Sequence, residues 1–486
     1  MSVVARQSFK YTLIGYFGFL LGTFSAVFVF NRDFEFYGKL RFIMNSAEFI
    51  APFIILGVSY SNVKFFYHAH KDGRHHNMLS LSLVVVFINF FIFLLGVGLA
   101  PIAFPKIKQL EFWNYKFYIL PLVLMLSISP VFNKFISNYK RVAISNVFDN
   151  LFPKIANLLA FSLFFFCGFS QVISFTTFLA VFFFSMMGYA LYTQRLEPIR
   201  LDFSTDYFRK NHLWKDFSSY SFFGFLGTFG NQLTINNQMV GEFLGMEDMG
   251  VYSILYSLIS LVSIPQLGLF NVSAPMINQY LNEKKYGALD AFYKKSSLYL
   301  FFLGAVLFSC IVVGFPFLAL LMKNGALLLY YQPVVWIWGL AVLFDLATGF
   351  NGNILSLSQY YKFNIVVMIL LSALTVSLNL YFIHYTELRL VGVAISTAIS
   401  LTIYNVIKVA FNYWKFKVQP FGIEMMYGTI ICTISMSVVM ILPNATHDFI
   451  NLIYKPSLVL IFIFIGNKVL KLIPMNELLK KFQRKN

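Results

Sequence analysis

Residues 11–30 read YTLIGYFGFLLGTFSAVFVF, a run without a single charged side chain. An apolar run of about 20 residues is the length that crosses the hydrocarbon core of a bilayer as a helix. The whole chain of 486 residues has the same character, because 58% of its residues are hydrophobic, 12% are charged and the mean hydropathy is +0.71. An ordinary soluble domain has about 25% charged residues. The sequence therefore predicts an all-α integral membrane protein.

Further windows of similar length and polarity predict about fourteen transmembrane helices. The first set of predicted spans is 11–30, 40–62, 79–100, 116–136, 143–168 and 172–194. The second set is 217–240, 250–275, 296–320, 328–352, 363–385, 391–411, 421–442 and 449–469. The run at 11–30 is too long for the core of a signal peptide, about 7–15 residues, and no A-x-A site follows it. We therefore expect an uncleaved first helix.

A short repeat links the first and seventh predicted spans. The sequence FGFLGTF at 223–229 nearly repeats FGFLLGTF at 17–24. Because the two spans are six apart, they cross the membrane in the same direction, which predicts two parallel six-helix lobes around a central cavity. The predicted domains are an N-terminal lobe at 1–200, a C-terminal lobe at 201–418, and two extra helices with a basic tail at 419–486.

Lys and Arg residues predict the orientation. If the N-terminus lies inside, 27 of the 37 Lys and Arg residues fall in inside segments and 8 in outside loops, with Lys154 and Lys455 within spans. The inside set counts Lys408 together with Lys415 and Lys417. This bias predicts that both termini are cytoplasmic. It also explains the net charge of +17 by contact with anionic lipid headgroups, without nucleic acid.

Sequence motifs favour neither an enzyme nor a cofactor. All three cysteines, Cys167, Cys310 and Cys432, fall in apolar segments and imply neither a disulfide nor a metal framework. The His-rich run YHAHKDGRHH at 67–76 lies in a basic inside loop with one acid and no cysteine, so no metal site is predicted there. No nucleotide-binding loop, nucleophile elbow, HExxH motif or paired acids appears.

Few ionisable side chains interrupt the spans, and each costs about 3 kcal/mol to insert. Glu48 and Asp345 lie near mid-depth, where a carboxylate either binds a coupling proton or sodium ion or forms a hydrogen bond between helices. Lys154 follows Pro153 and lies about one turn from Asp149. It either pairs with Asp149 or lines a cavity that accepts an anionic group such as phosphate.

Five side-chain amides occur between residues 231 and 238. On a helical wheel they spread too widely to face one cavity. Asn236, Asn237 and Gln238 lie about 30 Å along the helix from residue 217, so we expect them at the outer membrane interface. The remaining candidates for the cavity lining are Asn231, Gln232 and Thr234.

Three stretches resemble the bacterial Wzx-type polysaccharide exporters, the lipid-linked oligosaccharide flippases of the MOP superfamily. Residues 249–297 resemble the eighth-helix region through GVYS at 250–253, Pro275 and YKKS at 293–296. The stretch SLNLYFIHYTELRLVGVAISTAIS at 377–400 resembles the eleventh and twelfth helices. FEFYGKLRF at 34–42 resembles the first outer loop and the second helix.

The resemblance implies flipping of undecaprenyl-pyrophosphate-linked oligosaccharide across the bacterial inner membrane by alternating access, for surface polysaccharides such as O-antigen or capsule. Its implied partners are the glycolipid, membrane lipids, and a proton or sodium ion. Many relatives have Asp or Arg late in the seventh helix, where this chain has NNQ at 236–238. Lys154 is therefore the main cation for the pyrophosphate, supplemented by Arg41 at a helix end.

Two other classes stay open. One is another transporter of the same superfamily, either a lipid II flippase or a cation-coupled multidrug extruder, and the carboxylates Glu48 and Asp345 favour the extruder. The other is an integral-membrane glycan polymerase or acyltransferase, which would need a long outer loop or a membrane-embedded acid and His pair. The sequence shows neither, so a non-enzymatic transporter is predicted.

Overall fold

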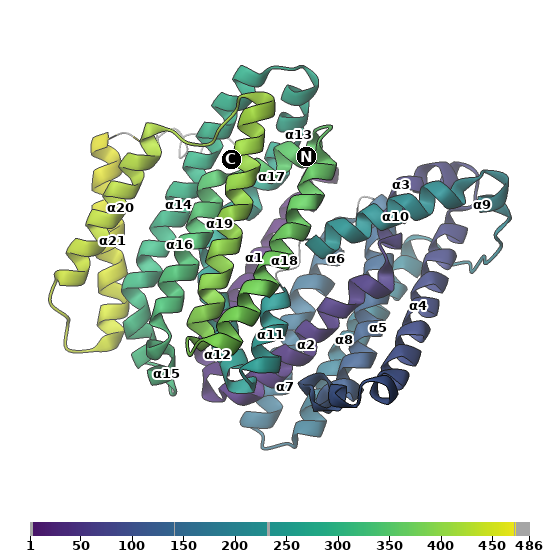
Figure 1. The fold of residues 1–486 in the computed structure, drawn as a ribbon, viewed down its shortest axis with the longest axis horizontal. Helices are drawn as coiled ribbons and strands as arrows, with labels where there is room; N and C mark the ends of the chain where they lie inside the picture. The colour runs from purple at the N-terminus through teal and green to yellow at the C-terminus, as the bar shows by residue number, and fades with distance from the viewer. Residues whose placement is uncertain (1–2, 140, 231–233, 471, 473–486) are drawn as a thin grey trace. The chain divides into compact units, whose positions relative to one another are not determined.

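The computed structural model describes residues 3–139, 141–230, 234–470 and 472, and every regular element in these ranges is helical (Figure 1). The helices group into two compact units, Met1–Ile254 and Leu255–Asn486. The predicted lobe boundaries after residues 200 and 418 stay predictions.

Unit 1 is a bundle in which α5 packs on α2, α3 and α8, and α7 packs on α8. The last two helices that lie wholly in the unit also join it, since α10 packs on α3 and α11 packs on α2. Its helices are α1 (Val3–Phe28), α2 (Phe34–Ile55), α3 (Val58–Lys71), α4 (His75–Ala103), α5 (Glu111–Asn138), α6 (Val142–Asn146), α7 (Phe152–Phe165), α8 (Gln171–Leu196), α9 (Asp206–Lys210), α10 (Leu213–Gly230) and α11 (Thr234–Phe243).

Unit 2 is built around α14, which packs on α16, α20 and α21, while α19 packs on α16 and α18. The helix α12 (Met246–Ile259) carries the chain from unit 1 into unit 2. The further helices are α13 (Ile264–Asn282), α14 (Tyr286–Leu320), α15 (Gly325–Tyr330), α16 (Gln332–Thr348), α17 (Asn351–Leu357), α18 (Tyr361–Tyr385), α19 (Arg389–Phe416), α20 (Ile423–Ile441) and α21 (Asp448–Leu470).

The prediction of an all-α membrane protein is confirmed. Among the described residues, eleven helices are long and apolar enough to cross a membrane, or up to thirteen if each of two bent pairs is one span. The bent pairs are α2 with α3, at 49°, and α16 with α17, at 48°. These thirteen coincide with predicted spans. The predicted span 217–240 is divided between α10 and α11, and residues 231–233 between them lie outside the described residues.

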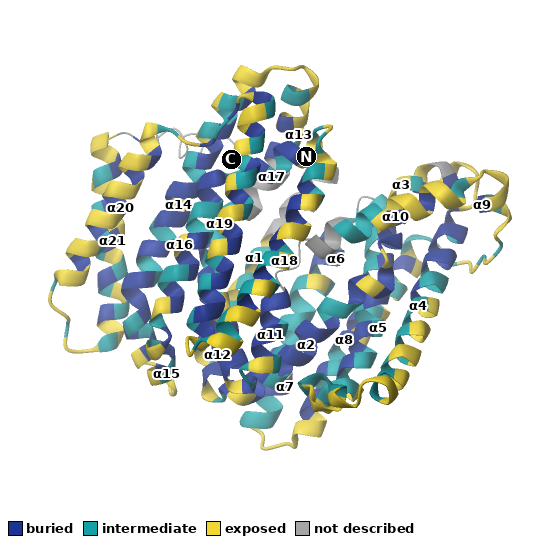
Figure 2. Cartoon of the chain, viewed as in Figure 1, coloured by how far each residue is buried: buried dark blue, intermediate teal, exposed yellow. Residues whose placement is uncertain are grey.

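Apolar side chains cover the outside of α4. Figure 2 shows long exposed stretches on α4, and they contain Phe87, Ile88, Phe91, Ile92 and Leu95. These residues occupy positions i, i+1, i+4, i+5 and i+8, which lie on one face of a helix. An apolar face of this length suits contact with lipid tails. The backbone polar groups of the helix are bonded within it, so they need no water.

Two glycines allow α2 and α12 to touch backbone to backbone. A Cβ added to Gly38 would lie 1.7 Å from the carbonyl oxygen of Met246, and one added to Gly250 would lie 1.9 Å from that of Phe34. No side chain fits at such distances, so glycine is required at both positions. Both glycines belong to stretches that carry the resemblance to the exporters.

Candidate functional site

Two cations and one carboxylate meet in unit 1. Arg41 and Glu48 are both on α2, seven residues apart, so they lie on one face about 10 Å apart along the axis. Lys154 is in the first turn of α7, and all three charges interact electrostatically. The sequence predicted Arg41 at a helix end. In the structure it lies within α2. The cluster carries a formal charge of +1.

The guanidinium of Arg41 keeps a free donor. Its Nη2 donates to Asn45 Oδ1 at 3.4 Å and its Nη1 lies 3.7 Å from Met44 Sδ, but its buried Nε has no hydrogen-bond partner. The amide of Asn157 on α7 contacts the same sulfur, also at 3.7 Å, so α2 and α7 meet beside the guanidinium. An arginine with an unused N–H is suited to bind an oxygen of a phosphate or carboxylate.

Lys154 does not pair with Asp149. Its Nζ donates to the backbone oxygen of Asn150 at 2.9 Å, and its side-chain stem lies against Gly22 of α1. The carboxylate of Asp149 instead accepts a 2.6 Å hydrogen bond from the Tyr189 hydroxyl. The ion-pair interpretation of Lys154 is therefore wrong, because Asp149 lies in the π-helical turn Val147–Leu151 and bonds to α8.

The amide-rich stretch is only partly within the described residues. Asn231 and Gln232 lie outside them, and Thr234 begins α11 without a described side chain. Asn236 and Asn237 are buried, and Gln238 accepts a 2.8 Å hydrogen bond from Ser46 of α2. The last three amides therefore contact protein, and their position at the outer membrane interface stays a prediction.

Asp345 lies in unit 2 within a separate polar network. Its Oδ1 accepts a 2.8 Å hydrogen bond from Asn405 of α19, and Asn405 Oδ1 accepts one of 2.7 Å from Asn351 of α17. Asn412 donates to the backbone of Asn351 at 3.0 Å. These bonds tie α19 to both helices of the bent pair α16 and α17.

Lys408, which the orientation count placed among the inside segments, is a buried charge within α19 that the sequence analysis did not name as a site residue. Lys408 lies within α19 and is 3% exposed, with its Nζ 3.6 Å from the ring centroid of Tyr404 and in electrostatic contact with Asp345. A signal was present, because Asn405, Lys408 and Asn412 recur at three and four residues and so form one polar helical face.

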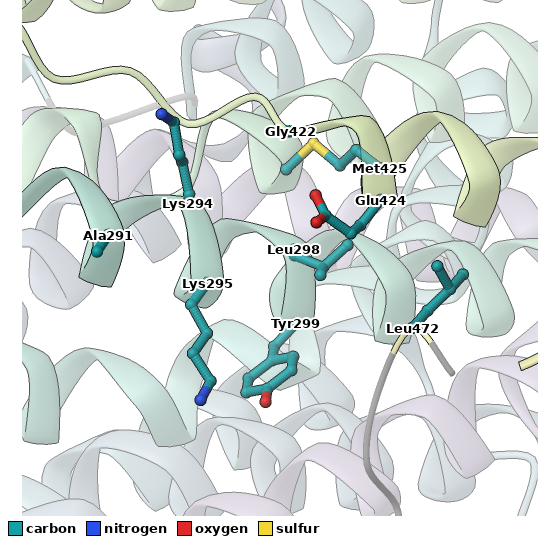
Figure 3. Close-up of a pocket in the computed structure, with 9 residues that line it drawn as sticks. All are labelled: Ala291, Lys294, Lys295, Leu298, Tyr299, Gly422, Glu424, Met425 and Leu472. Atoms are coloured by element: carbon teal, nitrogen blue, oxygen red, sulfur yellow. The ribbon is translucent and has the colours of Figure 1, made fainter. Parts of the chain in front are cut away.

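A cavity of about 450 Å³ lies elsewhere in unit 2, between α14 and the start of α20. Figure 3 shows that two of its lining residues, Lys294 and Lys295, point in opposite directions from α14. Lys294 also pairs with Asp290 at 2.7 Å. Because the lysines do not converge, they form no common anion site, and none of the predicted site residues that the structure describes lines this cavity.

No family model and no curated protein matches the sequence. The fold, however, is similar to that of solved transporters. The lipid II flippase MurJ in an inward closed conformation aligns with a TM-score of 0.68 and 14% identity, over 95% of this chain and 98% of that one. An inward-facing multidrug resistance transporter of the MATE family and MOP superfamily aligns with a TM-score of 0.60 and 15% identity, over 82% and 94% of the two chains.

A third similar structure is a MOP superfamily transporter from Pyrococcus furiosus, with a TM-score of 0.55 and 15% identity over 85% of this chain and 95% of that one. It is described as having a binding pocket of reversed polarity. At such low identity these likenesses establish the fold alone, which is that of the MOP superfamily transporters. The narrower resemblance to Wzx-type exporters stays a prediction.

Proposed function

We propose that this protein flips a lipid-linked oligosaccharide across the bacterial inner membrane by alternating access. The observation that carries the proposal is the cluster of Arg41, Glu48 and Lys154, whose net charge is positive. A pyrophosphate linking lipid to sugar is the anionic part of such a substrate. The fold likeness supports a transporter or flippase in general, and the sequence resemblance supports this substrate class.

In this proposal Arg41 and Lys154 bind the pyrophosphate oxygens. The unpaired Nε of Arg41 and the ammonium of Lys154 supply charge-assisted hydrogen bonds. Glu48 interacts with both cations and therefore competes with the substrate for them. This competition weakens substrate binding enough for release, which a transporter needs as much as capture.

A cation-coupled multidrug extruder is the second candidate, and the carboxylates Glu48 and Asp345 are the observation that favours it. A cavity for cationic drugs needs an excess of negative charge. Here Glu48 faces two cations, and Asp345 faces Lys408. The balance of charge therefore supports an anionic substrate over a cationic one.

The test is flipping of undecaprenyl-pyrophosphate-linked oligosaccharide in proteoliposomes. Lys154→Ala removes one charge-assisted contact of about 1.5–3 kcal/mol, so we expect at least a tenfold slower rate at equal protein level. Lys154→Arg should retain most activity, and the exposed Lys362→Ala is the matched control. Unchanged flipping in Lys154→Ala would contradict the assignment of the cluster.

Deleting the gene distinguishes the two transporter classes in cells. We expect loss of the surface glycan with unchanged drug sensitivity. An unchanged surface glycan together with raised drug sensitivity would favour the extruder instead.

A further inference from the structure

The start of α4 and the end of α8 bring two imidazoles and a carboxylate together in unit 1. His75 and His76 are the first two residues of α4, and Glu197 is the residue that ends α8. Glu197 Oε1 lies 3.5 Å from His75 Nε2 and 3.6 Å from His76 Nε2. One donor atom from each residue lies within 4.8 Å of the other two.

Hydrogen bonding does not explain this arrangement. At 3.5 and 3.6 Å, both contacts are long for an N–H···O hydrogen bond and lie in the range of a His–Glu ion pair. His75 is 6% exposed, and neither of its ring nitrogens has a hydrogen-bond partner; His76 Nδ1 has none either. Buried polar atoms are rarely left unbonded, because each costs free energy. The Nε2 of His75, which faces Glu197 without a hydrogen bond, therefore points to a ligand at this position.

The spacing fits a metal ion. A tetrahedral zinc ion lies about 2.0–2.2 Å from its nitrogen and oxygen ligands, which places neighbouring ligand atoms about 3.4 Å apart. The observed 3.5 and 3.6 Å match that separation closely. We propose that His75, His76 and Glu197 bind a divalent first-row transition-metal ion. Two imidazole nitrogens exclude the hard cations magnesium and calcium, which take oxygen ligands.

Neighbouring side chains hold the ligands in place. Adjacent helical residues normally point about 100° apart, yet the rings of His75 and His76 have centroids only 4.1 Å apart. The Tyr139 hydroxyl, just past the end of α5, lies 3.4 Å from the second oxygen of Glu197 and donates to it. The ring of His70 lies 4.5 Å from that of His75. Three protein ligands leave a fourth position for water or for His70.

The bound ion would join the ends of α4 and α8, with α5 adjoining through Tyr139. It is therefore a clamp on one end of the unit 1 bundle, independent of the Arg41 cluster and of the proposed transport function.

The test is zinc titration of tag-free protein in detergent after removal of metals with a chelator. Isothermal titration calorimetry should show one Zn²⁺ per chain. Glu197→Gln keeps the shape of the side chain and its bond from Tyr139, and should weaken the site at least tenfold, as should His75→Ala. His384→Ala and His447→Ala are the controls, with unchanged affinity expected.

The spectrum of bound cobalt is a second measurement. It reports direct ligation of the metal, so it would not change if Glu197 had only a structural role. Co²⁺-loaded protein should show the visible absorption of a four-coordinate site with nitrogen and oxygen ligands, and Glu197→Gln should abolish it. The proposal is overturned if the wild-type protein binds no Zn²⁺, or if binding and the cobalt spectrum are unchanged in both Glu197→Gln and His75→Ala.

Discussion

Replacing Lys408 with methionine tests whether the buried charges of unit 2 act as a pair. Methionine preserves most of the apolar stem of the side chain and removes only its charge. The change leaves Asp345 without its cation, although the hydrogen bond from Asn405 remains. It also removes the contact between the ammonium and the ring of Tyr404.

The expected loss of stability is large because Lys408 is only 3% exposed. Lys408 and Asp345 interact electrostatically but form no ion pair within 4.0 Å, so the loss of about 3–5 kcal/mol that is typical of breaking a buried ion pair is an upper bound for this change. Replacing both partners with neutral residues is far less costly. We therefore expect the double variant Lys408→Met/Asp345→Asn to regain most of the stability lost in Lys408→Met.

The assay is a denaturant titration in detergent, followed by tryptophan fluorescence, for the wild type, both single variants and the double variant. The double-mutant cycle gives the coupling energy directly. We expect a coupling energy of about 1–3 kcal/mol. A loss below about 1 kcal/mol in Lys408→Met, with a coupling near zero, would show that the two charges do not act together and would refute the reasoning.

Two further predictions concern unit 1. Burial alone would raise the pKa of Asp202, but hydrogen bonds from Ser204 and Arg74 outweigh it and hold the pKa below the usual 3.8. The charged form of Asp202 therefore stabilises the fold above that pH. Asp202→Asn should lower the thermal unfolding temperature at pH 7 and have less effect as the pH falls below about 4. An equal loss at both pH values would contradict this. Gly38→Ala should strongly destabilise the bundle, because its Cβ would lie 1.7 Å from a backbone oxygen of α12. Gly96→Ala is the control, since a Cβ there would lie in open space. Equal melting temperatures of the two variants would contradict the close contact of α2 with α12.

The membrane architecture was predictable because the bilayer imposes one length and one polarity on every span. The bends in the chain have weaker signals in the sequence. The break between α2 and α3 follows Pro52 and includes Gly57, yet both helices lie in one predicted span. Mean hydropathy is an average over the whole window. It therefore detects the length of an apolar span but not a bend within it.

The charged site was predictable in its members but not in its contacts. Glu48 and Lys154 stood out as ionisable groups within predicted spans, and Arg41 as a cation at a helix end, but nothing in the sequence placed α2 beside α7. The same limit hid the role of Glu197, because the carboxylate that completes the His75 and His76 group lies far along the chain. Local spacing reveals partners on one helix only.

The contact between Gly38 and Gly250 gives α2 a mechanical role. The first turn of α12 touches the backbone of α2 with no side chain between them. No flexible side chains are therefore present at this contact to adjust if one segment moves along the other. Arg41 lies one turn beyond Gly38 on the same helix. The first turn of α12 and the part of α2 that carries Arg41 are therefore in direct backbone contact within unit 1, so a shift of one requires a shift of the other.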